Sequence, residues 1–258
     1  NYYNSNMLGI NNWEDLYSID KSDDICLNHL NRFINGRFHY GYKNLIPFEK
    51  GYNLFTNKII FKILHACEDK VRVLEKNTNG KVILLFRHPI AVSLSRKELP
   101  RLKAFIKGDY NRFFNSNQLD YAKKIFENGS FLEKAILDWC FQNYLLLNNI
   151  SKNWIILTYE QLVIEPDIII SKLKEEFRDL NIKDIMSNIK NASRTTHKSD
   201  NETKKKFKEK SYDKKWLTQK WLNKVSIKEK NNVSTILDMF NIDIYKADSP
   251  IANQKYWI

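Results

Sequence analysis

The feature of this sequence that most constrains its fold is a wholly apolar run of five residues, Val82–Phe86. The turn-forming pair Asn79-Gly80 precedes the run, and Arg87 and Pro89 follow it. A short apolar run bounded by a turn fits a central parallel strand that is covered on both faces. Pro89 marks the first turn of a helix, because the N–H that proline lacks is not needed there. We therefore expect a buried strand, then Arg87, then a helix.

Further along the chain, strands and helices alternate. Residues Phe131–Ile150 carry apolar side chains at three- and four-residue steps, which predicts a helix. Trp154–Thr158 is a second short apolar strand, and Pro166 opens an amphipathic helix over Asp167–Phe177. Ile227–Phe240 is expected to form a last helix. This alternation predicts an α/β fold with three layers, in which a central parallel sheet has helices on both faces.

The composition fits one packed domain over residues 1–258. The hydrophobic fraction is 43% and the charged fraction is 28%, which argues against disorder. The net charge of +12 favours anionic partners. Much of the surplus lies in Lys204–Lys215, inside a basic segment, Thr203–Lys215, that lacks an apolar period and is expected to be a mobile loop.

Three cysteines, Cys26, Cys67 and Cys140, have no paired spacing and form no metal-binding motif. They suit a reducing compartment or simple burial, and we expect a cytoplasmic location. No apolar run approaches the ~20 residues that span a bilayer, so no membrane span is expected in this chain.

Arg87 is the first candidate for ligand binding. Ligands in parallel α/β sheets bind beyond the carboxyl ends of the strands, where a helix N-terminus also offers N–H groups to an anion. A guanidinium is a permanently charged fork that can hold two phosphate oxygens, and the hydroxyls of Ser93 and Ser95 add neutral donors. The alternative is that Arg87 makes a salt bridge at the strand end and that the serines only decorate the helix. The residues alone leave both interpretations open.

Arg87, Pro89 and Ser95 resemble the 3′-phosphate-binding motif of sulfotransferases that use 3′-phosphoadenosine 5′-phosphosulfate. That motif is a hydrophobic strand, then Arg-x-Pro, then a Ser eight residues after the Arg. The resemblance implies that Arg87 and Ser95 hold the 3′-phosphate, that adenosine 3′,5′-bisphosphate is the product, and that no metal takes part.

Two further segments extend the resemblance. Ile156–Pro166 is similar to the family's strand that ends in Tyr-Glu-x-Leu before a Pro-started helix, which implies that Tyr159 lies near the adenine. The alternative for Tyr159 is a core aromatic with a satisfied hydroxyl. Trp221–Tyr245 resembles the family's last helix and closing tyrosine. Ala192–Ser199 occupies the region that closes over the nucleotide. Its candidate phosphate contacts are Arg194, or alternatively Ser193 and Lys198, although basic residues in such a loop are commonly just solvated.

One part of the family pattern is missing from this sequence. Sulfotransferases carry a Gly/Ser/Thr-rich loop after their first strand, and its backbone N–H groups cradle the 5′-phosphosulfate. Before Leu54 the chain has only four scattered glycines, Gly9, Gly36, Gly41 and Gly51. Since the chain begins at Asn1, we expect the first strand and this loop to lie upstream. If they do not exist, the chain is an inactive relative.

The catalytic candidates lie in Leu54–Leu64, a predicted strand that runs into a helix or loop, and just after it. Lys62 and His65 resemble the Lys-x-His of one sulfotransferase branch with one extra residue between them, and Lys58 lies closer to the Lys of another branch. The resemblance implies that Lys62 stabilises the leaving group and that His65 is the general base, with Lys58 as the alternative. Both Lys62 and His65 could equally be helix-surface residues.

The predicted function is transfer of a sulfuryl group to a hydroxyl or amine of a small metabolite or a carbohydrate. The acceptor pocket is expected in variable loops, Asn1–Lys50 and Leu99–Asn128, whose aromatic side chains line a pocket or belong to the core: Trp13, Tyr40, Phe105, Tyr110, Phe113 and Phe114. One alternative is a basic nucleic-acid-binding protein, for which the sequence holds no binding motif, so that no nucleic-acid partner is expected. Another is a catalytically inactive nucleotide-binding relative. The sequence leaves the oligomeric state open.

Overall fold

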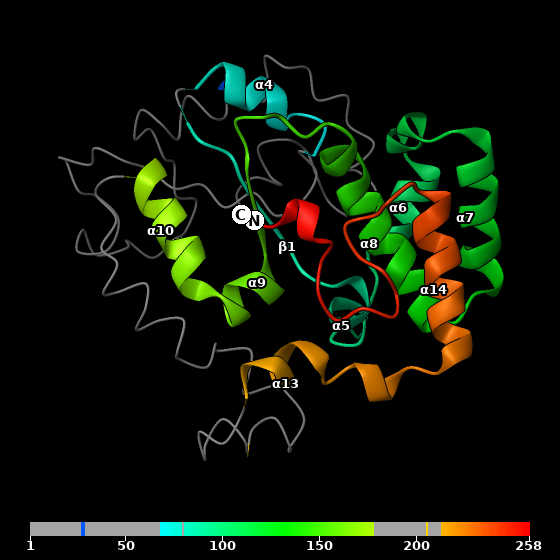
Figure 1. The fold of residues 1–258 in the computed structure, drawn as a ribbon. Helices are drawn as coiled ribbons and strands as arrows, with labels where there is room; N and C mark the ends of the chain where they lie inside the picture. Colours follow the sequence, from blue (N-terminus) through cyan, green and yellow to red (C-terminus); the bar gives the residue numbers. More distant parts are fainter. Residues whose placement is uncertain (1–26, 29–67, 79, 178–204, 206–212) are drawn as a thin grey trace, which may run out of the picture.

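The computed structural model describes residues 27–28, 68–78, 80–177, 205 and 213–258. Figure 1 shows the arrangement of its helices and strands. In chain order they are α4 (Val71–Lys76), β1 (Ile83–Phe86), α5 (Pro89–Ser93), α6 (Leu102–Lys107), the 3₁₀ helix η2 (Asp109–Phe113), α7 (Ser116–Asn128), α8 (Phe131–Asn148), β2 (Ile155–Thr158), α9 (Tyr159–Ile164), α10 (Pro166–Glu176), α13 (Lys214–Gln219), η4 (Leu222–Lys224), α14 (Ile227–Met239) and η5 (Gln254–Tyr256).

The two strands form a parallel pair. The register aligns Ile83 with Ile155 and Phe86 with Thr158, so both strands end at the same edge. The predictions of a strand before Arg87 and of a second strand before Tyr159 are therefore confirmed. The described part of the chain is mostly helical, and its sheet contains these two parallel strands.

The two faces of the strand pair pack against different clusters of apolar side chains. The expectation that the strand before Arg87 is covered on both faces is wrong, because Ile83 and Leu85 of β1 are 44% and 61% exposed. Leu84 and Phe86 of β1 belong to a large core cluster that also contains the buried residues of α8. Ile155 and Leu157 of β2 pack instead with Ile169 of α10 in a second cluster. In Figure 1, α8 and its neighbours accordingly lie on one side of β1 and α10 lies on the other.

Helix α8 is the centre of the larger core and contacts α5, α6, α7 and α14. Ser130 and Glu133 form a reciprocal capping box that satisfies backbone N–H groups at its start. The predicted helix over this segment is confirmed, as are those now seen as α5, α10 and α14. Cys140 is fully buried in α8, where burial raises the pKa of its thiol.

Residues 99–128, within which acceptor-pocket loops were expected, are mostly helical. The structure forms α6, η2 and α7 there, and α7 begins at a capping box made by Asn115 and Gln118. Phe105, Tyr110 and Phe114 are buried in the core, so the core interpretation holds for them and not the pocket interpretation. The ring of Phe105 stacks on Phe141 of α8, and the ring of Phe114 meets Phe141 edge to face, so both side chains help to pack this segment against α8.

The basic segment also differs from expectation at its C-terminal end. Lys214 and Lys215 begin α13, because the Asp213 side chain caps this helix by accepting from the Lys215 N–H. Lys205 is helical as well.

The chain after α14 returns to the strand ends. Asn241 has a positive φ of 50°, which stops the helix, and the Ile242 N–H bonds back to the Leu237 carbonyl. Ile244 and Tyr245 are then buried, and η5 lies against β2. In Figure 1 this segment, drawn in red, passes between α14 and β1. None of the described helices is both long and apolar enough to cross a membrane.

Candidate functional site

Arg87 and Tyr159 meet at the common edge of the two strands. Each follows the last residue of its strand, Phe86 or Thr158, and the register pairs those last residues. The Arg87 Cζ lies 4.5 Å from the centroid of the Tyr159 ring, which is a cation–π contact. The structure thus brings together two of the residues predicted to bind a nucleotide, from positions 72 residues apart.

The guanidinium of Arg87 has unused hydrogen-bonding capacity. Its Nε is buried, and within the described residues no group accepts from it. A buried N–H without an acceptor is costly, and such groups are commonly completed by water or a ligand. The salt bridge proposed above as the alternative role of Arg87 is not formed with any described residue.

Glu160 lies buried beside this pair and bridges two chain segments. Its Oε1 accepts from the His88 N–H at 3.0 Å, and its Oε2 accepts from the Tyr245 hydroxyl at 2.6 Å. Burial raises the pKa of the Glu160 carboxyl, while the bonds from Tyr245 and His88 and the charge of Arg87 act against that shift.

His88 is fully buried between the strand end and the C-terminal segment. Its ring stacks on Trp221 at a centroid distance of 4.2 Å, and the edge of Tyr245 lies 5.0 Å away. Its Nε2 lies 3.1 Å from the Lys246 carbonyl, so Nε2 carries the proton. Burial lowers the pKa of His88 to about 4, and the ring is neutral at pH 7. Sequence reasoning missed His88, because the middle residue of Arg-x-Pro carries no signal for burial.

The two serines after Arg87 lie differently from expectation. Helix α5 ends at Ser93, so Ser95 lies beyond it and is exposed. The Ser95 hydroxyl donates to the Val92 carbonyl at 2.6 Å, and it must rotate before it can donate to a phosphate. Ser93 is buried in α5, and its hydroxyl has no hydrogen-bond partner among the described residues.

The start of α5 offers fewer N–H groups to an anion than we expected from the sequence. The helix has only five residues, and its first residue, Pro89, has no N–H. The N–H of His88 before it is used by Glu160. Among the described groups at this edge, the side chain of Arg87 is therefore a better candidate for binding an anion than the start of α5.

The remaining predicted site residues lie outside the described residues. They are Lys58, Lys62, His65, Ser193, Arg194 and Lys198. The structure therefore neither joins them to Arg87 and Tyr159 nor separates them from that pair.

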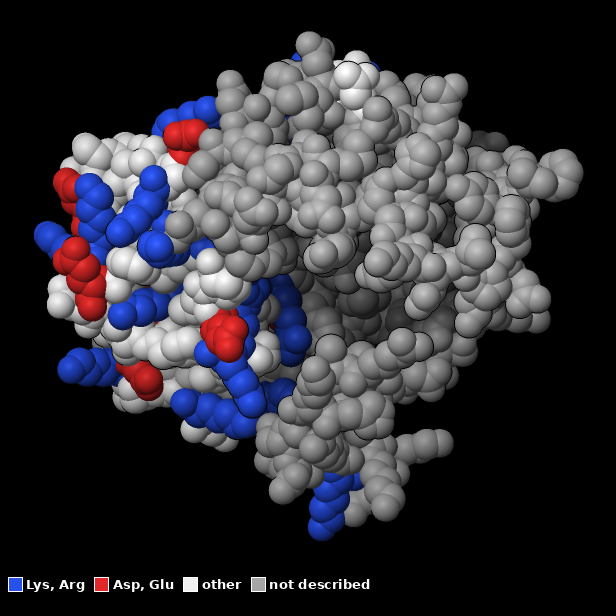
Figure 2. Space-filling model, turned by 180° about the vertical axis from the view of Figure 1, so that it is seen from behind, with Lys and Arg blue, Asp and Glu red and all other residues white. Residues whose placement is uncertain are grey.

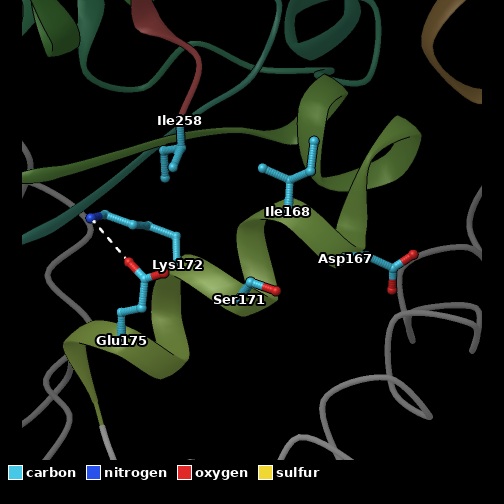
Figure 3. A pocket seen from close by; sticks show the side chains of 6 residues that line it. All are labelled: Asp167, Ile168, Ser171, Lys172, Glu175 and Ile258. Carbon is cyan, nitrogen blue, oxygen red and sulfur yellow. Dashed lines mark ion pairs between the residues drawn. The ribbon is translucent and has the colours of Figure 1, made fainter.

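A groove of about 420 Å³ lies along α10. Figure 3 shows its lining, which consists of Asp167, Ile168, Ser171, Lys172, Glu175 and Ile258. The Lys172 ammonium lies 3.5 Å from Glu175 and 3.6 Å from Glu176, so its charge is already balanced. No residue predicted to bind the nucleotide lines this groove.

The surface charge agrees with the composition. Figure 2 shows that Lys and Arg predominate over Asp and Glu on the described part of that face. In the part of the chain that the structure describes, no three His, Cys, Asp or Glu side chains gather as metal ligands.

Comparison of the chain with protein-family models, with curated proteins and with solved structures found no match.

Proposed function

We propose that this protein is a sulfotransferase that binds the 3′-phosphate of 3′-phosphoadenosine 5′-phosphosulfate at Arg87. The observation that carries the proposal is the Arg87–Tyr159 pair at the common end of two parallel strands, with a buried Nε that lacks an acceptor. Carboxyl ends of parallel strands are where α/β proteins bind nucleotides. The central sheet in this proposal is larger than the strand pair and has helices on both faces.

The pair suits a phosphate next to an aromatic base. The Tyr159 ring supports one face of the guanidinium, which leaves the N–H groups at its rim for oxygen atoms. A phosphate dianion accepts two parallel bonds from such a fork. The same half-buried ring also offers an apolar edge to adenine.

The transfer step needs little covalent help from the protein. The bond between sulfur and the 5′-phosphate oxygen breaks, and a bond from sulfur to the acceptor oxygen or nitrogen forms. In the proposal His65 takes the acceptor proton, and Lys62, or alternatively Lys58, stabilises the leaving phosphate oxygen. Adenosine 3′,5′-bisphosphate is released, and the acceptor is a small metabolite or a carbohydrate.

The binding half of this proposal is tested by calorimetric titration with adenosine 3′,5′-bisphosphate and with adenosine 5′-monophosphate. We expect the bisphosphate to bind at least tenfold more tightly, since a charge-assisted bidentate contact contributes about 1.5–3 kcal/mol. Arg87→Ala should remove this preference. Arg87→Lys is the matched control, because it keeps the charge but loses the fork, and it should retain only part of the preference.

Equal affinity of the folded protein for the two nucleotides would contradict the proposal. So would an Arg87→Ala variant that keeps the preference of the parent chain.

A further inference from the structure

We propose that Glu160 is a positioning residue, which holds Arg87 over Tyr159 and is itself held by the hydroxyl of Tyr245. This inference rests on the proposed function only in naming the ligand that Arg87 binds. It assigns to the segment after α14, over residues 242–258, a role in shaping the anion site from a distance.

Glu160 is connected to the backbone next to both Arg87 and Tyr159. It follows Tyr159 directly, and its Oε1 accepts from the N–H of His88, the residue that follows Arg87. One carboxylate therefore ties the backbone beside the guanidinium to the backbone beside the ring. Glu160 is only 1% exposed, and a hydrogen bond to a buried carboxylate is stronger than one in water.

The C-terminal segment completes this arrangement. The Tyr245 hydroxyl donates to the other oxygen of Glu160 at 2.6 Å, and burial together with the Glu160 charge raises the pKa of Tyr245, so the hydroxyl keeps its proton. The Lys246 carbonyl lies 3.1 Å from the His88 ring. The C-terminal segment thus contacts Glu160, which follows Tyr159, and His88, which follows Arg87.

Gln161 extends the same connection by one residue. Its Nε2 donates to the Ile258 carbonyl at 3.1 Å, and its Oε1 accepts from the Ile258 N–H at 3.2 Å. Residues 160 and 161, which follow the ring, are thus both bonded to the segment over residues 242–258. Loss of the Tyr245 hydroxyl should free one oxygen of Glu160 and loosen the turn that carries Arg87.

The chain contains a matched control for Tyr245. Tyr256 lies in the same segment and its hydroxyl also donates to a carboxylate at 2.6 Å, but that carboxylate is Asp243 at the surface. Tyr245→Phe and Tyr256→Phe therefore remove the same kind of bond, one next to the Arg87–Tyr159 pair and one away from it. Glu160→Gln keeps the size of the side chain and removes its charge.

The first readout needs no ligand. NMR of arginine-labelled protein reports the upfield shift that the Tyr159 ring imposes on the Arg87 side-chain protons, with Arg87→Lys assigning the signal and Tyr159→Leu abolishing the shift. We expect Tyr245→Phe and Glu160→Gln to lose most of the shift, while Tyr256→Phe keeps it. The second readout is the affinity for adenosine 3′,5′-bisphosphate, which should fall about tenfold in the first two variants and stay unchanged in the third.

The two readouts separate this inference from the proposed function. An Arg87 shift that is unchanged in Tyr245→Phe and in any folded Glu160→Gln protein overturns the positioning role, whatever the nucleotide does. The other outcome is that Tyr245→Phe and Glu160→Gln lose the Arg87 shift while the parent chain does not bind the bisphosphate. That result supports the positioning role of Glu160 and contradicts the proposed ligand. Because Tyr245→Phe keeps its buried ring, it decides the matter if Glu160→Gln fails to fold.

Discussion

At the scale of single residues, Asp138 shows how a buried charge is held in this protein. It is fully buried on α8, and its Oδ2 accepts from Arg101 at 3.0 Å, from Arg96 at 3.2 Å and from Gln142 at 2.6 Å. Burial raises the pKa of Asp138, and the two arginines act against that shift. The helical period of α8 gave no sign of this, because an aspartate in a helix normally faces water.

We predict that Asp138→Asn lowers the free energy of unfolding by about 3–5 kcal/mol, because it removes the buried negative charge that pairs with Arg101 at 3.0 Å. Urea denaturation measures the change. Asp120→Asn is the control, since Asp120 pairs with Lys123 at 3.4 Å with both side chains exposed, and its loss should cost at most about 0.5 kcal/mol. Similar losses in the two variants would show that the buried pair is not important for stability.

At the scale of elements, the junction of α7 and α8 depends on a close approach at Gly129. Its φ of −72° is ordinary, so the reason for glycine is space and not backbone conformation. A Cβ at this position would lie 2.6 Å from the Ile125 carbonyl oxygen and 2.9 Å from the Ile125 Cγ2. A real Cβ would therefore push α7 away from the start of α8.

Gly129→Ala should lower the free energy of unfolding by about 1–3 kcal/mol, as overpacking against backbone does. Thermal unfolding followed by circular dichroism measures it. Gly80→Ala provides the comparison, because there the nearest atom is a side-chain oxygen of Thr78 at 3.2 Å, which can move. An unfolding temperature that drops as much for Gly80→Ala as for Gly129→Ala would contradict the steric argument.

At the scale of the whole molecule, His88 joins the strand end to the C-terminal half. It touches Trp221, Tyr245 and the Lys246 carbonyl, and burial lowers its pKa from 6.5 to about 4. Between pH 6.5 and about pH 4, His88 is protonated in the unfolded chain but neutral in the folded chain. The free energy of unfolding therefore falls as the pH falls. The raised pKa values of Glu160 and Asp138 act in the opposite direction, since those carboxyls keep a proton better in the folded state.

We therefore predict that His88→Phe flattens the acid side of the stability curve. Relative to this variant, the parent chain should lose about 2–3 kcal/mol more of its unfolding free energy between pH 7 and about pH 4.5. Urea denaturation at several pH values gives both curves. Two parallel curves would mean that His88 takes up its proton in the folded state as readily as in the unfolded one.

Local pattern was sufficient for the elements around the candidate site. The apolar run before Arg87, the similar run before Tyr159 and the proline at position 89 predicted both strands and α5, because strand and helix starts depend on neighbouring residues. The helical segment over residues 102–128 was missed, since its aromatic side chains face a core that distant residues supply.

The arrangement of the site required the folded chain. Arg87 and Tyr159 were each singled out from sequence, but their contact follows from the register between two strands that the helices α5 to α8 separate. The places of His88 and Glu160 depend on Trp221 and Tyr245, which follow much later in the chain. Burial of a polar side chain is a property of what packs against it. Sequence patterns therefore identified Arg87 and Tyr159 as candidates, whereas long-range packing set their contact and the partners and protonation of the buried His88 and Glu160.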